Sequence, residues 1–455
     1  MTMVGLVKQR SSTGWLLLAL LGLMLPAALM GSPTASHDDP VASLGLSLVL
    51  ILAFARLGGD MAVRLGQPAV LGELVFGVFI GNLSLAGYGG FEYLKTEPML
   101  DMLARLGVLL LLFEVGLEST VGQMLAVGWS SLLVAVLGVA APFALGWAAS
   151  AWLLPDTSVY VHAFLGATLT ATSVGITARV LKDLGESQSG EARIILGAAV
   201  IDDVLGLVIL AVVSGVISAA SAGQTMAVGH VLGIVTKAGL FLVGALVLGM
   251  ALSPRLFHLA SKLQSEGVLL SAGLSCCFLL AWVANAIGLA PIVGAFAAGL
   301  VLESVHFSDF TDRGEHGLEE LLAPLCSVLV PIFFVLMGMR TELASFARPG
   351  VLGLAAALTV AAIVGKQLCG LGVLTPGVDR LTVGLGMIPR GEVGLIFANL
   401  GLTLEYSGRR IVEPAVFSAV VVMVILTTLA TPPALKWSLR RARATRDSAD
   451  GGGHV

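Results

Sequence analysis

The chain is divided into long apolar runs, which short polar stretches separate, and most of the charged residues lie in those stretches. Each run lasts about 20 residues, the length that an α-helix needs to cross the hydrocarbon core of a bilayer. A transmembrane β-barrel would instead show alternating apolar and polar residues over about ten positions. The runs therefore predict an all-α polytopic membrane protein.

Thirteen apolar segments follow an N-terminal leader. In residues 1–36, Lys8 and Arg10 precede an apolar run and small residues follow it. This arrangement is typical of a secretory signal peptide, and a retained extra helix is the alternative. The thirteen segments are centred near residues 50, 76, 108, 140, 170, 206, 240, 278, 297, 332, 362, 392 and 424. We expect a transmembrane domain over residues 41–436 and a short cytoplasmic tail over 437–455.

The distribution of basic residues predicts the orientation, because cytoplasmic loops carry an excess of Lys and Arg. If the C-terminal tail is cytoplasmic, fourteen basic residues fall on that side of thirteen spans and five on the other. The five are Lys95, Arg340, Arg348, Arg409 and Arg410. We therefore expect the mature N-terminus outside and the C-terminus in the cytoplasm.

Composition agrees with a membrane protein and narrows the functional classes. Of the 455 residues, 57% are hydrophobic and 12% are charged, against about 25% charged in a soluble domain. The 56 glycines suit membrane helices that pack closely through small residues. The four cysteines lie in or beside apolar runs, so we interpret them as buried small residues. No basic stretch suggests nucleic acid, and we expect no cofactor.

Three pairs of short stretches indicate an internal repeat. Residues 69–77 resemble 291–299, and 112–116 resemble 334–338, with one and the same offset along the chain. A third match, at nearly the same offset, relates 173–176 to 392–395. Seven spans separate the copies, so the two repeats, about 41–220 and 267–436 with a linker helix near 227–252, would have opposite orientations. Inverted repeats of this kind are typical of secondary transporters.

The fifth and twelfth segments are the least helix-like and are equivalent in the repeat. Residues 168–177 are rich in hydroxyl side chains, which compete with helical backbone bonding. Residues 387–394 contain Pro389 and two glycines. We expect two broken helices that cross, where Thr172 and Ser173 could offer oxygen atoms to a cation. The alternative is that these hydroxyl groups only pack helices.

The strongest candidate chemistry is the pair Asp202 and Asp203, near the middle of the sixth segment. A carboxylate at that depth costs a few kcal/mol or more and by default marks an ion or proton pathway. Adjacent helix positions point about 100° apart, so one aspartate can hold a counter-charge while the other titrates. Lys366 is the candidate counter-charge. Arg390 and Glu392 are expected to pair with each other or with the broken helix ends.

Four segments together resemble the double-aspartate bacterial sodium/proton exchangers of the monovalent cation:proton antiporter superfamily. They are residues 170–173, residues 198–206 with both aspartates, Gly365-Lys366 and Pro389-Arg390-Gly391-Glu392. The resemblance covers about residues 41–436. It implies a sodium/proton antiporter fold of about thirteen helices, an elevator-like core domain and a homodimer. It also implies that Asp203 binds the cation, that Asp202 pairs with Lys366, and that Thr172 and Ser173 lie beside the site.

A competition mechanism follows for such a site. Proton and sodium would compete for one buried carboxylate, so Na⁺/H⁺ exchange is the main expectation, and Li⁺ or K⁺ could replace Na⁺. The resemblance to double-aspartate exchangers implies that this exchange is electrogenic. K⁺/H⁺ antiport is the first alternative and a sodium-coupled organic-anion symporter the second. A channel or an intramembrane aspartyl protease fits the repeat and the adjacent aspartates less well. We therefore expect a transporter rather than an enzyme.

Overall fold

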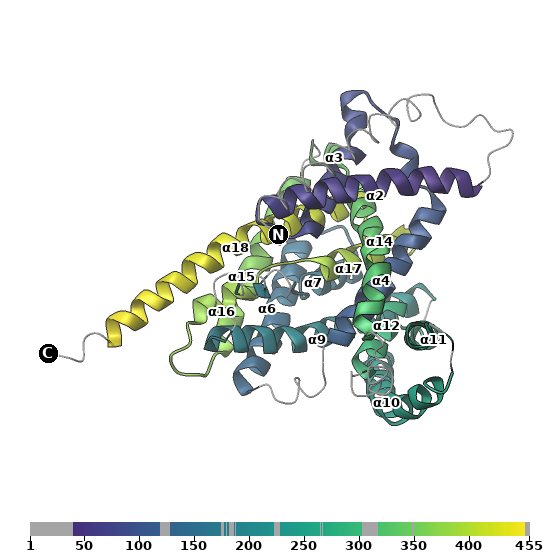
Figure 1. Ribbon diagram of the computed structural model, residues 1–455. Helices are drawn as coiled ribbons and strands as arrows, with labels where there is room; N and C mark the ends of the chain where they lie inside the picture. Colours follow the sequence, from purple (N-terminus) through teal and green to yellow (C-terminus); the bar gives the residue numbers. More distant parts are fainter. Residues whose placement is uncertain are drawn as a thin grey trace, which may run out of the picture. The chain divides into compact units, whose positions relative to one another are not determined.

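The computed structural model describes residues 40–118, 128–173, 177–178, 180–181, 186, 188–222, 228–263, 265, 267–302, 317–347 and 350–450. These residues are almost entirely helical (Figure 1). The chain divides into two compact units, which we call unit 1 (Met1–Val108 and Leu325–Phe346) and unit 2 (Leu109–Pro324 and Ala347–Val455). The predicted leader, residues 1–36, lies outside the described residues.

Unit 1 is built from α2, α3, the first part of α4 and most of α14. The bounds are α2 Pro40–Arg64, α3 Ala69–Gly81, α4 Pro98–Glu118 and α14 Leu318–Met339, with short 3₁₀ turns η1 Leu83–Ala86, η2 Glu92–Lys95 and η4 Leu343–Ala347. Glycines allow the helices to touch: a Cβ at Gly58 or Gly72 would collide with the facing backbone of α3 or α2. Such contacts let membrane helices associate through van der Waals packing.

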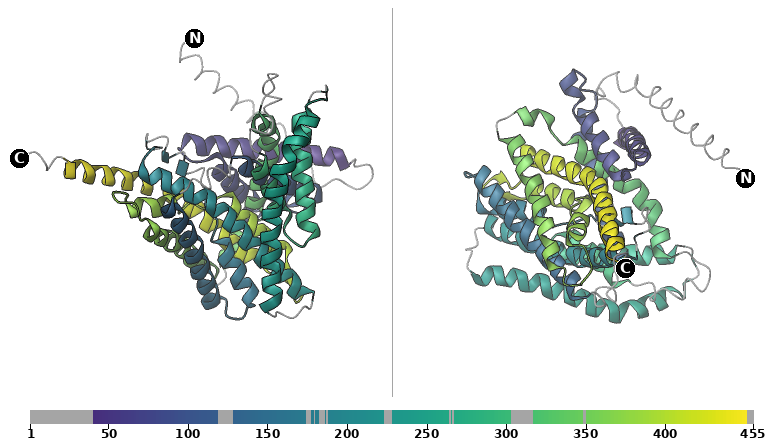
Figure 2. Two further views of the ribbon diagram at one scale, coloured as in Figure 1. Left: turned by 90° about the horizontal axis from the view of Figure 1, so that it is seen from below. Right: turned by 90° about the vertical axis from the view of Figure 1, so that its left-hand side faces the viewer.

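Unit 2 contains the remaining elements. They are α6 Trp129–Leu153, α7 Val159–Thr168, α9 Gly190–Ser221, α10 Val228–Ala260, α11 Val268–Ala286, α12 Pro291–Val301, α15 Val351–Leu368, η5 Cys369–Gly372, α16 Arg380–Gly386, α17 Glu392–Thr403 and α18 Pro414–Asp450. A hairpin of β1 Glu405–Tyr406 and antiparallel β2 Arg409–Arg410 turns through Ser407 and Gly408, both at positive φ. The yellow helix α18, with 37 residues, is the longest described helix (Figure 2).

The prediction of a polytopic helical membrane protein is confirmed. Eight described helices are long and apolar enough to cross a membrane, and four shorter apolar helices, Ala69–Gly81, Val159–Thr168, Pro291–Val301 and Val393–Thr403, accompany them. Helices cover or flank all thirteen predicted segments. The count of thirteen crossings stays a prediction. The predicted linker, near 227–252, falls within α10, and the predicted tail from residue 437 begins inside α18.

Equivalent elements and contacts recur at the offset found in the sequence. Helix α3 begins at Ala69 and α12 at Pro291, which are the first residues of two matched stretches. In unit 1 a Cβ at Gly77 would collide with the Val335 carbonyl oxygen. In unit 2 a Cβ at Gly299 would collide with the Phe113 carbonyl oxygen. Gly77 and Gly299, like Phe113 and Val335, are separated by the offset of the first two matched stretches.

Candidate ion-binding site

Two interrupted helices meet inside unit 2, and the interruptions are the basis of the site. Helix α7 ends at Thr168, and residues 171–173 are not helical. Helix α16 ends at Gly386 and α17 begins at Glu392, so that 388–391 are not helical. The backbone N–H of Ser173 donates a hydrogen bond of 2.9 Å to the Pro389 carbonyl oxygen, which joins the two segments.

Close backbone approach makes this crossing possible. A Cβ at Gly391 would lie 2.5 Å from Ser173 Oγ and 2.6 Å from Ser173 Cβ, so no side chain fits there without a shift. Thr177, which follows the first segment, donates its hydroxyl to the Gly386 carbonyl oxygen at 2.6 Å. The non-helical backbone is therefore buried in protein, which is the condition under which it is tolerated at membrane depth.

A fully buried ion pair lies in the same unit. Lys366 Nζ on α15 donates to Asp202 Oδ1 on α9 at 2.7 Å, and both side chains have 0% exposure. Gly138 on α6 leaves room for the ammonium group, since a Cβ there would lie 3.4 Å from Nζ. Because each charge alone would be strongly disfavoured in this environment, the two groups depend on one another. The structure thus brings Lys366 to the first aspartate of the pair.

Arg390 holds the unwound segments together with its side chain. The guanidinium is fully buried and donates to the carbonyl oxygens of Thr170, Ala171 and Ala362, with the Thr170 and Ala362 contacts at 3.4 Å. The Thr170 and Ala171 carbonyls follow the C-terminal end of α7, where a positive charge is favoured by the helix dipole, and the Ala362 carbonyl lies one turn before Lys366 on α15. Arg390 therefore contacts a broken helix end, one of the two partners expected for it.

Two buried oxygen atoms at the site lack a hydrogen-bond partner among the described residues. They are Asp202 Oδ2 and Thr172 Oγ1. Thr172 is 3% exposed, so its hydroxyl is removed from bulk water. Unsatisfied buried oxygens are unfavourable unless water or an ion occupies the space beside them. Oxygen atoms of this kind are the ligands that small cations prefer.

The other predicted residues lie on the same elements. Asp203 follows Asp202 on α9 and is partly exposed, whereas Ser173 is buried at the crossing. Glu392 begins α17, and its side chain lies outside the described residues. Sequence reasoning missed Thr428 on α18, whose hydroxyl donates to the Arg390 carbonyl oxygen at 2.6 Å. Its only signal is the hydroxyl pair Thr427-Thr428 within an apolar run.

Known structures and sequences share this architecture. The chain resembles the sodium proton antiporter MjNhaP1 of Methanocaldococcus jannaschii at pH 8, with a TM-score of 0.62 and 17% identity over 89% of this chain and 97% of that one. It is 36% identical to the high-affinity Na⁺/H⁺ antiporter NhaS3 of Synechocystis sp., covering 87% of this chain and 90% of NhaS3. It is 34% identical to the Na⁺/H⁺-K⁺ antiporter GerN of Bacillus cereus, covering 86% and 95%.

The match to a family model has the same extent. Residues 48–440, which include every candidate site residue, match the model of the transmembrane sodium/hydrogen exchanger. The crossing of two unwound segments, the buried aspartate–lysine pair and this match agree with one another. The chain belongs to the sodium/hydrogen exchanger family.

Proposed function

We propose that this protein is a secondary transporter that exchanges protons for monovalent cations, sodium foremost. The observation that carries the proposal is the buried Asp202–Lys366 pair beside the crossing of two unwound segments. Such crossings place helix ends and backbone oxygens at the depth where transported ions bind. The sodium/proton antiporters among the relatives support the same reading.

In the proposed mechanism Asp203 binds the proton or the cation. Asp202 is occupied by Lys366, and Asp203 lies about 100° further round α9, so the two carboxylates have different roles. Thr172 Oγ1 offers a further oxygen to a cation. A site that changes sides readily only when the carboxylate is neutralised makes exchange obligatory. Proton and metal ion then compete for the same negative charge.

Lys366 would set the charge that each cycle moves. If Lys366 releases its proton when the cation binds, two protons are exchanged for one sodium and transport is electrogenic. A neutral residue at this position would leave Asp203 as the only titrating group. We therefore propose electrogenic exchange in the natural chain and electroneutral or uncoupled exchange without the lysine.

Sodium is proposed as the main cation and potassium as the alternative. K⁺ is the alternative for two reasons. One relative is named an Na⁺/H⁺-K⁺ antiporter, and the oxygen ligands available here can bind either ion. Sodium-coupled transport of an organic anion is the weaker candidate, because the buried Lys366 is already paired with Asp202.

Repeat, assembly and location are also proposals. The recurrence of helix starts and glycine contacts at the offset of the matched stretches supports an inverted repeat. The Lys and Arg distribution supports a cytoplasmic C-terminus in a bacterial inner membrane. A homodimer is inferred from the resemblance to the antiporter superfamily.

The direct test is cation-driven proton flux in everted membrane vesicles, with Na⁺, Li⁺ and K⁺ compared. Asp203→Asn should abolish exchange, because an amide cannot exchange a proton for a cation, while the protein still inserts. Arg440→Gln is the matched control, since Arg440 is exposed and distant in sequence from the site. Normal sodium-driven proton flux in Asp203→Asn would remove the proposal.

A further inference from the structure

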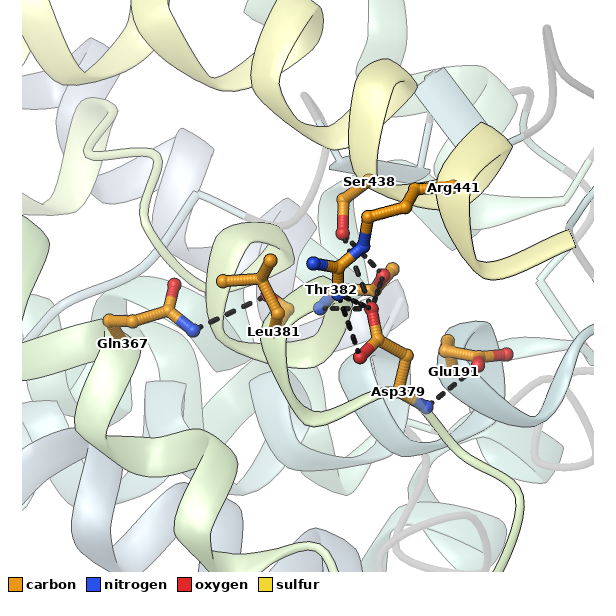
Figure 3. Close-up of polar contacts among 7 residues, drawn as sticks. All are labelled: Glu191, Gln367, Asp379, Leu381, Thr382, Ser438 and Arg441. Atoms are coloured by element: carbon orange, nitrogen blue, oxygen red, sulfur yellow. Dashed lines mark hydrogen bonds and ion pairs between the residues drawn. The ribbon is translucent and has the colours of Figure 1, made fainter. Parts of the chain in front are cut away.

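A cluster of polar side chains ties the C-terminal helix α18 to α16 (Figure 3). The cluster lies at the N-terminal end of α16, whereas the Pro389–Arg390 segment follows the other end. Asp379 caps α16: its Oδ2 accepts from the Thr382 N–H at 3.3 Å and from the Thr382 hydroxyl at 2.7 Å. From α18, Ser438 Oγ lies 2.7 Å from Thr382 Oγ1, and Arg441 Nη2 lies 3.3 Å from Asp379 Oδ2.

The cluster also reaches the helix that carries both aspartates. The backbone N–H of Asp379 donates to Glu191 Oε1 on the first turn of α9 at 3.0 Å. Thr382 and Ser438 have 0% exposure, so their hydroxyl contact is shielded from water. We call Glu191, Asp379, Thr382, Ser438 and Arg441 the Asp379 cluster. Three elements, α9, α16 and α18, therefore meet in it.

The carboxyl of Asp379 is held in its ionised form. Burial alone would raise its pKa, but the hydrogen bonds from Thr382 and the positive charge of Arg441 outweigh burial, so the pKa lies below its ordinary value. The group is thus a constant acceptor across the neutral range. Ser438 and Arg441 fall in the stretch that the sequence assigns to a tail, yet they belong to α18 and contact this acceptor.

Two of these elements, α9 and α18, also reach the ion-binding site, and the Pro389–Arg390 segment of the site follows the third, α16. On α9, Asp202 follows Glu191 by eleven residues, or about 16 Å of helix. On α18, Thr428 precedes Ser438 by ten residues, or about 15 Å, and binds the Arg390 carbonyl oxygen. Helix α16 has seven residues and ends at Gly386, three residues before Pro389. At this end a Cβ at Gly386 would collide with Ile195 of α9, and Thr428 of α18 holds the segment that follows, so α9 and α18 contact both ends of this part of the chain.

A further contact joins α16 to α15, the helix that carries the buried Lys366. Gln367, the residue after Lys366, donates from Nε2 to the Leu381 carbonyl oxygen at 3.4 Å (Figure 3). A Cβ at Gly384 would collide with the Gln367 side chain, so α16 packs directly against this amide. A displacement of α16 would consequently shift residues beside Lys366 as well as residues at the crossing.

We propose that Asp379 is a positioning residue for ion exchange. By capping α16 and joining it to Ser438 of α18 and Glu191 of α9, it fixes where the Pro389–Arg390 segment lies relative to Asp202 and Asp203. The inference rests on the proposed antiport function. According to this inference, the C-terminal end of α18, which lies outside the site itself, influences the affinity for the cation.

The experiment compares the KM for Na⁺ and Vmax of variants in proteoliposomes, with Vmax corrected for the amount of inserted protein. Asp379→Ala removes the cap and should raise KM about fivefold, the order expected for the loss of one helix cap, with Vmax nearly unchanged. Asp379→Asn keeps a capping oxygen and should stay within about twofold of the natural chain. Arg440→Gln, next to Arg441 but without a hydrogen bond or ion pair to the residues that the structure describes, is the control.

Two results would overturn the inference. One is a KM for Asp379→Ala equal to that of Arg440→Gln, and the other is a KM for Asp379→Asn as high as that for Asp379→Ala. If Asp379→Ala fails to insert, Ser438→Ala replaces it as the test, since this change removes only one buried hydroxyl. Ser438→Ala should also raise the KM for Na⁺, and an unchanged KM would contradict the proposal. If Asp203→Asn loses flux while the Asp379 and Ser438 variants keep an unchanged KM, only the role of Asp379 is overturned and the proposed antiport function stands.

Discussion

At the scale of single residues, the ion pair of Asp202 and Lys366 is the most consequential contact. Both groups are fully enclosed, so bulk water does not solvate either of them in this structure. Removing one partner of a buried pair typically destabilises a protein by about 3–5 kcal/mol, whereas removing both can be nearly neutral. The pair is therefore a determinant of stability as well as a proposed part of the transport cycle.

This asymmetry gives a testable prediction. Lys366→Met should lower the free energy of unfolding by about 3 kcal/mol, because Asp202 loses its partner. The double variant Asp202→Asn with Lys366→Met should recover much of that loss. Thermal unfolding of the purified protein in detergent measures both. A double variant no more stable than Lys366→Met would show that the cost does not come from the orphaned carboxylate.

Proton stoichiometry offers a second readout of the same lysine. In Lys366→Met we expect exchange, if it persists, to become insensitive to membrane potential, because the second exchanged proton is lost. Proteoliposomes with an imposed potassium diffusion potential would measure this. Transport that still responds to the potential as in the natural chain would count against the role proposed for Lys366.

At the scale of elements, the crossing depends on how closely two backbones can approach. Ser173 and Pro389 share a backbone hydrogen bond, and Gly391 faces the Ser173 side chain without room for a Cβ. Broken helices of this type need both the interruption and the close contact. A regular helix could not form the hydrogen bond between Ser173 and Pro389, because its own N–H and C=O groups are already paired.

Two glycines, one at this contact and one three residues further along the chain, provide a matched test. Gly391→Ala should separate the two segments and reduce exchange at least several-fold, because its Cβ would lie 2.5 Å from Ser173 Oγ. Gly394→Ala is the control, since the nearest atoms to its Cβ would be 3.7 and 3.9 Å away. Cation-driven proton flux per inserted protein is the measurement. Equal flux in the two variants would refute the importance of the close approach.

At the scale of the whole molecule, competition between proton and cation makes transport depend on acidity in a fixed direction. Below the pKa of the binding carboxyl, each unit rise in pH should lower the apparent KM for Na⁺ about tenfold, because protonated sites become rarer. Above that pKa the KM should level off. Flux measured between pH 6 and 9 at several Na⁺ concentrations tests this, and a KM indifferent to pH would contradict a shared site.

The sequence alone determined the class of the protein and showed that its candidate charged residues lie inside the membrane-spanning runs. Runs of about 20 apolar residues predicted a helical membrane protein, and the charged residues inside those runs singled out Asp202, Asp203, Lys366 and Arg390. Irregular composition near 172 and 389 predicted where helices break. These signals are local, because helix periodicity and the penalty for a buried charge are both properties of a short stretch of chain.

Only the tertiary structure decided which of these residues meet. Lys366 and Asp202 are 164 positions apart, and Thr428, Glu191 and Asp379 carried no signal that tied them to the site. A carboxylate at a helix start or a threonine in an apolar run has the same local pattern whether it contacts a distant segment or not. Long-range pairing depends on how helices pack, so it emerges only when their faces are brought together.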